Sequence, residues 1–326
     1  MRYRALGATG LEVSVIGYGA SPLGSAFRPV DEGDGIRAVR TALDLGVNFI
    51  DVSPYYGAMV AESVLGRALR GVDRDSYVLA TKVGRYGDAE FDFSAPRVIR
   101  SVDESLARLG VDHVDLIQCH DIEFGDLDQV VHETLPALRS LRDSGKVRFV
   151  GVTGYSLPAL GYVVEQTEID TILTYCRYTL ADRDLTRWLP LFERRGVGVV
   201  NASPLCMGLL SHAGPPDWHP APAELRRAAR QAVDLCALIG QDIAKVALQF
   251  AIAPAEFAGT IVGSADAENI ARNIAWAEEP LDQELAATLT DLFAAVPVTS
   301  WPTGRPENSA IAGIEAVADP GKRERS

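Results

Sequence analysis

Apolar and polar residues follow two repeating patterns along the chain. Short runs rich in β-branched residues alternate with longer stretches whose apolar residues recur every three or four positions, and these patterns indicate strands and helices respectively. Residues 3–18 predict two short strands around Gly7 and Gly10, a hairpin-like opening. The small residues from Gly17 to Ser21 follow, and they allow a close approach to the backbone.

After this opening the two patterns alternate regularly. Strands are predicted at residues 13–16, 47–50, 77–81, 114–119, 147–152, 171–175, 197–201 and 259–262. Helices are predicted at residues 35–45, 61–69, 95–109, 127–141, 157–164, 185–194, 223–238, 243–253, 267–277 and 283–294. Eight nearly continuous apolar strands separated by helices predict an α/β fold, a parallel (β/α)8 TIM barrel with an N-terminal β-hairpin and extra C-terminal helices. An open doubly wound sheet is the alternative, but no G-x-G-x-x-G follows an early strand.

Length and composition predict one barrel domain over residues 1–326. From residue 296 the chain becomes polar and Pro-rich, so this tail is expected to be partly disordered or to cover the barrel mouth. The net charge is −13 and the basic residues are scattered, which excludes nucleic acid and anionic membranes as expected partners. No apolar run has the length of a membrane span and no signal peptide begins the chain, so we expect a cytoplasmic protein, a monomer or small homo-oligomer. The four cysteines lack C-x-x-C spacing and are expected to be reduced core thiols.

Titratable residues stand at the ends of three consecutive predicted strands. Asp51 closes the second strand and Tyr56 lies on its loop, Lys82 follows the third strand, and His120 follows the fourth. Singly, such residues are commonly a helix cap, a solvated charge and a structural histidine. The carboxyl ends of barrel strands meet on one face, however, so we expect these four to form a catalytic site.

The four residue types suit one proton transfer. We expect the ammonium of Lys82 to lower the pKa of the Tyr56 phenol, Asp51 to orient Lys82, and His120 to hydrogen-bond the reacting oxygen. No nucleophile stands beside a base and no histidine–carboxylate spacing suggests a metal. Acid–base chemistry on a carbonyl or an alcohol is the remaining prediction.

The same four residues resemble the tetrad of the aldo-keto reductase superfamily. The resemblance extends over nearly the whole chain and includes Gly17-Tyr-Gly-Ala, Gly151-Val-Thr-Gly, Ala202-Ser-Pro-Leu and Val262-Gly-Ser. It implies a nicotinamide cofactor, with a helix that begins near Asp266 offering free N–H groups to the phosphates. The cofactor-binding residues that it implies are Gly19, Ala20, Thr153, Gly154, Tyr175, Ser203, Leu205, Gly263, Ser264, Asn269 and Asn273.

Two departures from the family pattern bear on the cofactor. Gly263 and Asn269 stand where many NADP-using relatives have basic residues, so NAD is the expected cofactor, with NADP as the alternative if Arg272 or Lys322 compensates. Many relatives have an aromatic residue in place of Ala202. We expect Tyr175, on the neighbouring strand, to supply the face that stacks on nicotinamide instead.

Further stretches resemble the aldose 1-dehydrogenases of this superfamily, of the L-galactose and L-fucose type. They include Ser53-Pro-Tyr-Tyr-Gly, Cys119-His-Asp-Ile-Glu-Phe-Gly, Met207-Gly-Leu-Leu and Pro215-Pro-Asp-Trp-His-Pro. This resemblance implies oxidation of an anomeric carbon to a lactone, with Tyr56 accepting the proton. The implied substrate-binding residues are Tyr55, His120, Asp121, Glu123, Trp218 and His219. The alternatives are that Asp121 and Glu123 face solvent and that Trp218 only packs its loop.

Three other functions remain open from the sequence. The same tetrad serves an NADPH-dependent reductase of aldehydes or ketones, and a nicotinamide-binding regulatory subunit is a third possibility. A sugar-phosphate isomerase on the same barrel would leave the pattern between Gly263 and Asn273 unexplained. The sequence does not select one aldose, because that choice depends on loop geometry.

Overall fold

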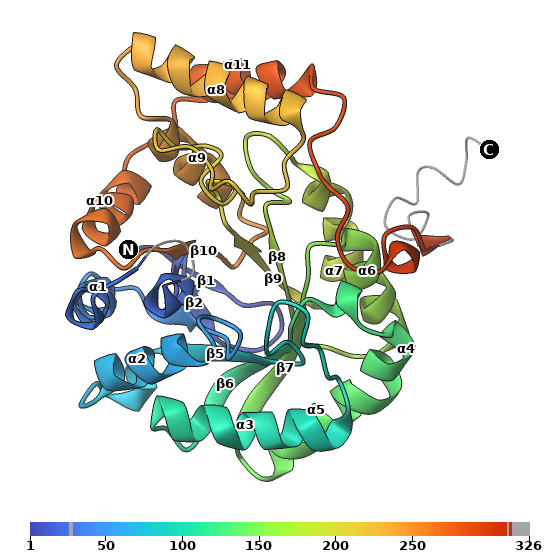
Figure 1. The fold of residues 1–326 in the computed structure, drawn as a ribbon. Coiled ribbons are helices and arrows are strands. Elements are labelled where there is room, and N and C mark those ends of the chain that lie inside the picture. The colour runs from blue at the N-terminus through green and yellow to red at the C-terminus, as the bar shows by residue number, and fades with distance from the viewer. Residues whose placement is uncertain (26–28, 312, 315–326) are drawn as a thin grey trace.

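Eight parallel strands close into a barrel in the order of the chain (Figure 1). The computed structural model describes residues 1–25, 29–311 and 313–314. Strand β10 pairs with both β9 and β3, so no sheet edge remains, and the barrel prediction is confirmed over the open sheet. The strands are β3 (Ile16–Gly19), β4 (Phe49–Asp51), β5 (Val78–Val83), β6 (Val114–Cys119), β7 (Val147–Thr153), β8 (Thr171–Tyr175), β9 (Gly198–Ala202) and β10 (Gly259–Gly263).

The N-terminal hairpin closes the amino end of the barrel. Strands β1 (Tyr3–Ala5) and β2 (Glu12–Ser14) pair antiparallel, so the first barrel strand begins at Ile16 rather than at residue 13 as predicted. Leu6, Leu11 and Val13 are buried in the part of the core at the amino end of the barrel. At Gly7, with φ +55°, a Cβ would lie 2.3 Å from the backbone nitrogen of Gly198, so the turn packs directly on β9.

Helices surround the barrel, and their ends follow local capping signals. Asp31, Asp242, Asp266 and Asp282 each accept a backbone N–H at the start of a helix. The helices are α1 (Glu32–Asp44), α2 (Val60–Leu69), α3 (Ala95–Leu109), α4 (Leu127–Gln129), α5 (Leu135–Asp143), α6 (Leu157–Gln166), α7 (Leu189–Arg194), α8 (Ala223–Leu238), α9 (Ile243–Ile252), α10 (Ala267–Glu278) and α11 (Gln283–Ala294).

Two predicted helices are not continuous. A π-helical turn, Val130–Thr134, separates α4 from α5, since Pro136 has no N–H for the carbonyl four residues earlier. The helix predicted at 185–194 begins as a 3₁₀ turn, Asp184–Arg187, and restarts as α7, where Pro190 occupies the first turn.

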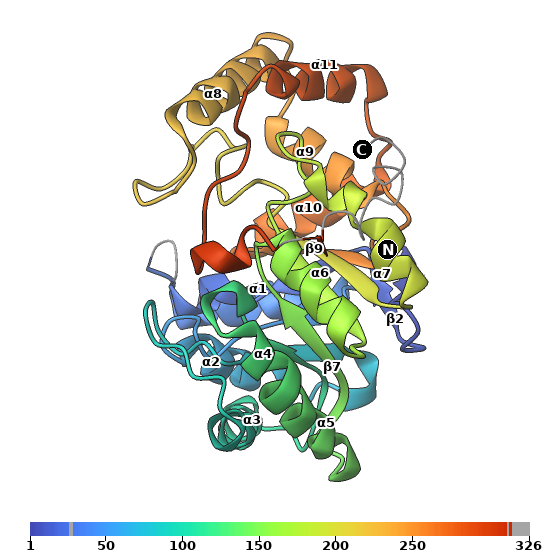
Figure 2. The same ribbon diagram turned by 90° about the vertical axis from the view of Figure 1, so that its right-hand side faces the viewer.

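The C-terminal segment runs along the barrel rim. Helices α8 and α11 lie together at one side of the molecule, and the chain after α11 descends from them to the 3₁₀ turn η6 (Pro306–Asn308) beside α6 (Figures 1 and 2). We call residues 296–311 the strap. All four cysteines are buried and unpaired, as predicted. Within the described chain no single helix is long and apolar enough to cross a membrane, whereas α8 and α9, bent by 108°, meet that test only as a pair.

Candidate active site

A buried ion pair lies at the carboxyl end of the barrel. Lys82, which lies inside β5 rather than after it, is 1% exposed, and its Nζ donates to Asp51 Oδ1, to the Val52 carbonyl at 3.0 Å and to the Tyr56 hydroxyl at 3.3 Å. Gln118, the residue beside Lys82 in the β5–β6 register, donates from Nε2 to Asp51 Oδ2 at 2.9 Å. All three ammonium donors and both carboxylate oxygens therefore have partners. The expected orientation of Lys82 by Asp51 is present.

The pKa of Tyr56 differs from the expectation. Burial raises the pKa of Tyr56 to about 12, because the desolvation of the phenolate outweighs the attraction of the Lys82 ammonium. The carboxylates of Asp51 and Asp121 add to the rise. The prediction that Lys82 brings this pKa below its ordinary value is therefore wrong. For Lys82 itself, burial acts to lower the pKa, but Asp51 and Tyr56 together raise it.

His120 is neutral and fixed by hydrogen bonds. Its Nδ1 lies 3.0 Å from Ser53 Oγ, which also accepts the Tyr55 backbone N–H at 3.1 Å. Burial lowers the pKa of His120 well below its usual value, and the cations of Lys82 and Arg85 lower it further. When Nδ1 accepts from the Ser53 hydroxyl, Nε2 bears the proton and can donate to an oxygen in the cavity.

A cavity of about 490 Å³ opens above these groups. The sequence-predicted residues in its wall are Gly19, Asp51, Tyr55, Tyr56, Lys82, His120, Asp121, Thr153, Tyr175, Ser203, Trp218 and Gly263. The predicted residues that lie outside its wall are Ala20, Glu123, Gly154, Leu205, His219, Ser264, Asn269 and Asn273. The strands thus bring the tetrad and one glycine wall together, but they leave the residues around α10 apart from this cavity.

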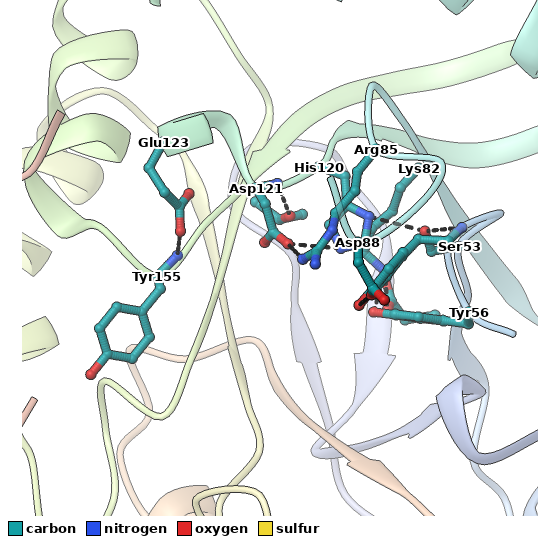
Figure 3. A network of polar contacts seen from close by, with 12 residues as sticks. Ser53, Tyr56, Lys82, Arg85, Asp88, His120, Asp121, Glu123 and Tyr155 are labelled. Carbon is teal, nitrogen blue, oxygen red and sulfur yellow. Dashed lines mark hydrogen bonds and ion pairs between the residues drawn. The ribbon is translucent and has the colours of Figure 1, made fainter. Parts of the chain in front are cut away.

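Asp121 and Arg85 form a second ion pair at the rim (Figure 3). Asp121 is 2% exposed, so the alternative that it faces solvent is wrong. One guanidinium nitrogen of Arg85 binds Asp121 Oδ2, whereas Oδ1 is buried and has no partner in the described part of the chain. Sequence reasoning missed Arg85, and it also missed Gln118, a polar residue at an inward position of an apolar strand, which was the available signal.

Glu123 is buried behind the rim. Its Oε1 accepts the Tyr155 backbone N–H at 2.8 Å, and its Oε2 has no partner (Figure 3). Burial, together with the charge of Asp121, raises the pKa of Glu123 to about 8. The main-chain oxygen of Glu123 accepts bonds from the Arg305 N–H and the Asn308 side chain, both at 2.9 Å. Glu123 therefore contacts the strap and does not face solvent.

The loop before α8 contributes one exposed ring and one buried ring. Trp218 is 58% exposed in the cavity wall. His219 is 3% exposed, with Nε2 bonded to the Cys206 carbonyl at 2.9 Å and Nδ1 accepting the Ala221 N–H at 3.0 Å. Both nitrogens of His219 are therefore used within the loop.

The strap supplies a further part of the wall that sequence reasoning did not assign to residues. Trp301, Pro302 and Thr303 line the cavity, and Trp301 stacks on Tyr155 with ring centroids 4.8 Å apart. Tyr155 in turn contacts the Tyr175 ring at 5.5 Å. Residues 312 and 315–326 of the predicted tail, which include Lys322, lie outside the described residues.

The wall formed by β3 and β10, next to Asp51 on β4, suits a flat ring. Gly19 and Gly263 are paired in register, and a Cβ on Gly19 would lie 2.8 Å from the Ile261 side chain, while one on Gly263 would lie 3.2 Å from the Gly19 carbonyl. Bare backbone therefore lines this side, with Ser203 and the Tyr175 ring nearby in the same wall. These residues fit a nicotinamide group and would hold it beside the tetrad.

The N-terminus of α10 differs from the expected phosphate site. The Asp266 carboxylate accepts the N–H groups of Glu268 at 2.9 Å and Asn269 at 3.4 Å. The prediction that these N–H groups are free for the phosphates is therefore wrong. A separate cavity of about 580 Å³ lies here against the start of α1. Its acidic lining residues are Asp31, Asp34, Asp266 and Glu268.

The basic residues near this end of α10 are engaged with neighbours. Arg37 binds Asp34, and Arg272 donates to Asn269 Oδ1. Elsewhere in the described ranges, no cluster of three or more His, Cys, Asp or Glu side chains has the arrangement of a metal site.

Comparison with known proteins gives one consistent group. Residues 15–293 match the model of the aldo/keto reductase family. The chain is 47% identical to L-galactose dehydrogenase of Arabidopsis thaliana over 94% of this chain and 98% of that protein, and 29% identical to D-threo-aldose 1-dehydrogenase of a Pseudomonas species over 88% and 96%. Among solved structures, an aldo-keto reductase of Bacillus halodurans in its holo form superposes with a TM-score of 0.76 at 27% identity, over 95% of this chain and all of that one.

Proposed function

The chain belongs to the aldo/keto reductase family, and from this we propose that it oxidises the anomeric carbon of an aldose of the L-galactose or L-fucose type to a lactone, with NAD as hydride acceptor. The observation that supports the chemistry is the contact of Lys82 Nζ with both Asp51 and the Tyr56 hydroxyl beneath a cavity large enough for a sugar. The substrate class rests on the likeness to two aldose-oxidising proteins of nearly the same length.

Each residue of the tetrad has a defined task in this proposal. Tyr56 accepts the proton of the anomeric hydroxyl, and Lys82, 3.3 Å away, stabilises the phenolate. Asp51 holds Lys82 charged and directed. His120, a neutral ring, donates from Nε2 to the reacting oxygen. The bound nicotinamide supplies the acceptor for the hydride that leaves the anomeric carbon as its C=O bond forms.

The rim residues hold the rest of the sugar in the proposal. Asp121, Tyr55 and Trp218 contact its hydroxyl groups and one face, since a polyol needs both hydrogen-bond partners and an apolar surface. Glu123 and His219, which lie behind the wall, maintain the loops that present these groups.

NAD is favoured over NADP by the charges around α10. Asp31, Asp34 and Glu268 line the cavity at its N-terminus, and Asp266 already occupies two of its N–H groups. A 2′-phosphate placed there would meet like charges, whereas the neutral ribose of NAD would not. Asn269 and Asn273 are the residues we assign to the adenosine end.

Reduction of aldehydes or ketones is the second candidate function, and one observation favours it. The pKa of Tyr56 is raised to about 12, so the phenol is protonated at neutral pH and is suited to donate a proton to a carbonyl oxygen. The two functions share the tetrad and differ in cofactor preference and direction.

The test is the initial rate of NADH or NADPH formation at mildly alkaline pH with L-galactose, L-fucose and D-arabinose, using the parent protein and Tyr56→Phe. Rapid NAD reduction with an aldose, lost in Tyr56→Phe, supports the proposal. Silence with every aldose, together with NADPH-dependent reduction of simple aldehydes, would establish the second candidate instead.

A further inference from the structure

We propose that Arg85 is a specificity-determining positioning residue, which fixes Asp121 so that its unpaired carboxylate oxygen accepts a hydroxyl next to the reacting centre of a neutral polyol. This inference rests on the proposed function and deepens it. It concerns a residue that the sequence did not single out, on the loop between β5 and α3.

Three aromatic rings, Phe91 from the same loop and Tyr55 and Phe124 from two neighbouring loops, surround the Arg85 side chain. Its guanidinium carbon lies 3.8 Å from the ring centroid of Tyr55, 5.3 Å from that of Phe91 and 5.6 Å from that of Phe124. The side chain is 15% exposed. A planar guanidinium stacked in this way has a fixed direction, which an ammonium on a flexible stem would not have.

Asp121 is held in a single orientation by its backbone and by Arg85. Its φ is +51°, in the left-handed region, and its N–H donates to Thr153 Oγ1 at 3.2 Å. Arg85 binds Oδ2, which also lies 3.6 Å from His120 Nε2 (Figure 3). A substrate hydroxyl bound to Asp121 would therefore lie beside the reacting substrate oxygen, to which His120 donates in the proposed function.

The unpaired carboxylate oxygen of Asp121 indicates what kind of ligand group it binds. Its Oδ1 is buried and has no partner among the described residues, and an unpaired buried carboxylate oxygen costs free energy until a donor reaches it. A sugar hydroxyl is such a donor. Because the Arg85 charge is matched by Asp121 and the three Lys82 donors are filled, neither cation of the wall is left for an acidic substrate.

Loss of Arg85 should change the charge state of Asp121. Burial raises the pKa of Asp121 above its usual value even with Arg85 beside it, and Arg85 opposes this rise more strongly than Lys82 does. The charged or titratable groups around Asp121 are Arg85, Lys82, His120, Glu123, Tyr55, Tyr56 and Tyr175. Without Arg85 the carboxyl is protonated to higher pH and no longer accepts at Oδ1.

The experiment is a double-mutant cycle on the full-length protein with Arg85→Met, Asp121→Asn and the two together, measured with NAD and the preferred aldose. We expect Arg85→Met to raise the sugar KM about tenfold to a hundredfold, the loss of one charge-assisted contact, with kcat within about threefold of the parent. Adding Arg85→Met to Asp121→Asn should cost less than about twofold, since both act through one carboxylate.

The pH profile separates this role from a merely structural one. In Arg85→Met, kcat/KM should rise with pH through an ionisation that lies at higher pH than in the parent, as Asp121 deprotonates. For Arg85→Lys, which keeps the charge, the pH of this ionisation should lie between those of the parent and Arg85→Met. Arg85→Lys replaces Arg85→Met in the experiment if Arg85→Met does not fold. The matched control is Arg97→Met. Arg97 is equally exposed at 15%, lies 3.7 Å from the Tyr86 ring and pairs with Glu104 outside the cavity, so its kinetics should match the parent.

Additive losses in the cycle, or an unchanged sugar KM in both Arg85 variants, would overturn the proposal. Failure of the proposed function is a different result, namely no NAD reduction by the parent with any aldose. In that case calorimetric titration of the NAD-loaded proteins with L-galactose decides the question. Weaker binding by Arg85→Met than by Arg97→Met supports the assignment, and equal or absent binding refutes it.

Discussion

The floor and the rim of the cavity satisfy their polar groups in different ways. On the floor, every donor of Lys82 and both oxygens of Asp51 have partners within the protein. On the rim, Asp121 is equally buried, yet its Oδ1 has no partner among the described residues, and the same is true of Oε2 of Glu123 behind the rim. The Lys82–Asp51 pair is thus satisfied before any ligand arrives, which suits a group that must be preorganised for proton transfer. The Oε1 of Gln118 beside this pair is buried without a partner among the described residues. The rim has open hydrogen-bonding capacity, which suits recognition.

Lys82→Met tests the floor and should have the largest effect. Because the phenolate of Tyr56 loses its cation, kcat for oxidation should fall by about 10²–10⁴. The free energy of unfolding should also fall by about 3–5 kcal/mol, since Asp51 is left buried and unpaired. Steady-state kinetics and urea unfolding measure the two effects.

The double variant Lys82→Met/Asp51→Asn separates stability from chemistry. It removes the unpaired charge, so stability should recover while kcat stays low. Recovery of kcat with stability would show that Lys82 only supports the fold.

Glu123→Gln tests the rim through pH. The folded protein raises the pKa of Glu123 from 4.5 to about 8, so it binds this proton more tightly than the unfolded chain. The contribution of Glu123 to stability is therefore complete below about pH 4.5 and is lost as the pH rises towards about 8. Relative to Glu123→Gln, the parent should lose at most about 1.4 kcal/mol per pH unit across this window. An equal difference in the free energy of unfolding between the parent and Glu123→Gln at pH 5 and at pH 8 would contradict a buried, protonated Glu123.

Asn308→Ala tests the strap and should have the smallest effect. The Asn308 side chain donates to the carbonyls of Glu123 at 2.9 Å and Gly125 at 3.0 Å, and its loss should loosen the segment that brings Trp301 to the cavity. We expect a sugar KM about threefold to tenfold higher with unchanged kcat, a loss of about 1 kcal/mol of contact free energy. Ser309→Ala is the control, because the Ser309 hydroxyl bonds only within the strap, to Thr303. Equal sugar KM values for Asn308→Ala and Ser309→Ala would show that the strap does not take part in substrate binding.

Most of the floor could be predicted from sequence because Asp51 and Lys82 stand at or near the ends of their strands, whereas Gln118, inside β6, was missed. Asp51 and Lys82 are placed by apolar runs that are local in sequence, and the barrel rule brings their ends together. The rim depends on contacts between distant segments, such as the bond from Arg305 to the Glu123 carbonyl, 182 residues apart, for which the sequence has no periodic signal. The pKa of Tyr56 was predicted wrongly because the sequence identifies its neighbours but not the extent of burial.

The most direct test of the central claim is isotope transfer from an aldose deuterated at C1. The account predicts that the parent transfers deuterium to NAD, that a lactone forms, and that the rate rises with pH as the Tyr56 phenol is deprotonated. Tyr56→Phe should transfer almost none. NAD reduction without deuterium transfer, or equal transfer by Tyr56→Phe, would contradict oxidation of the anomeric carbon by this tetrad.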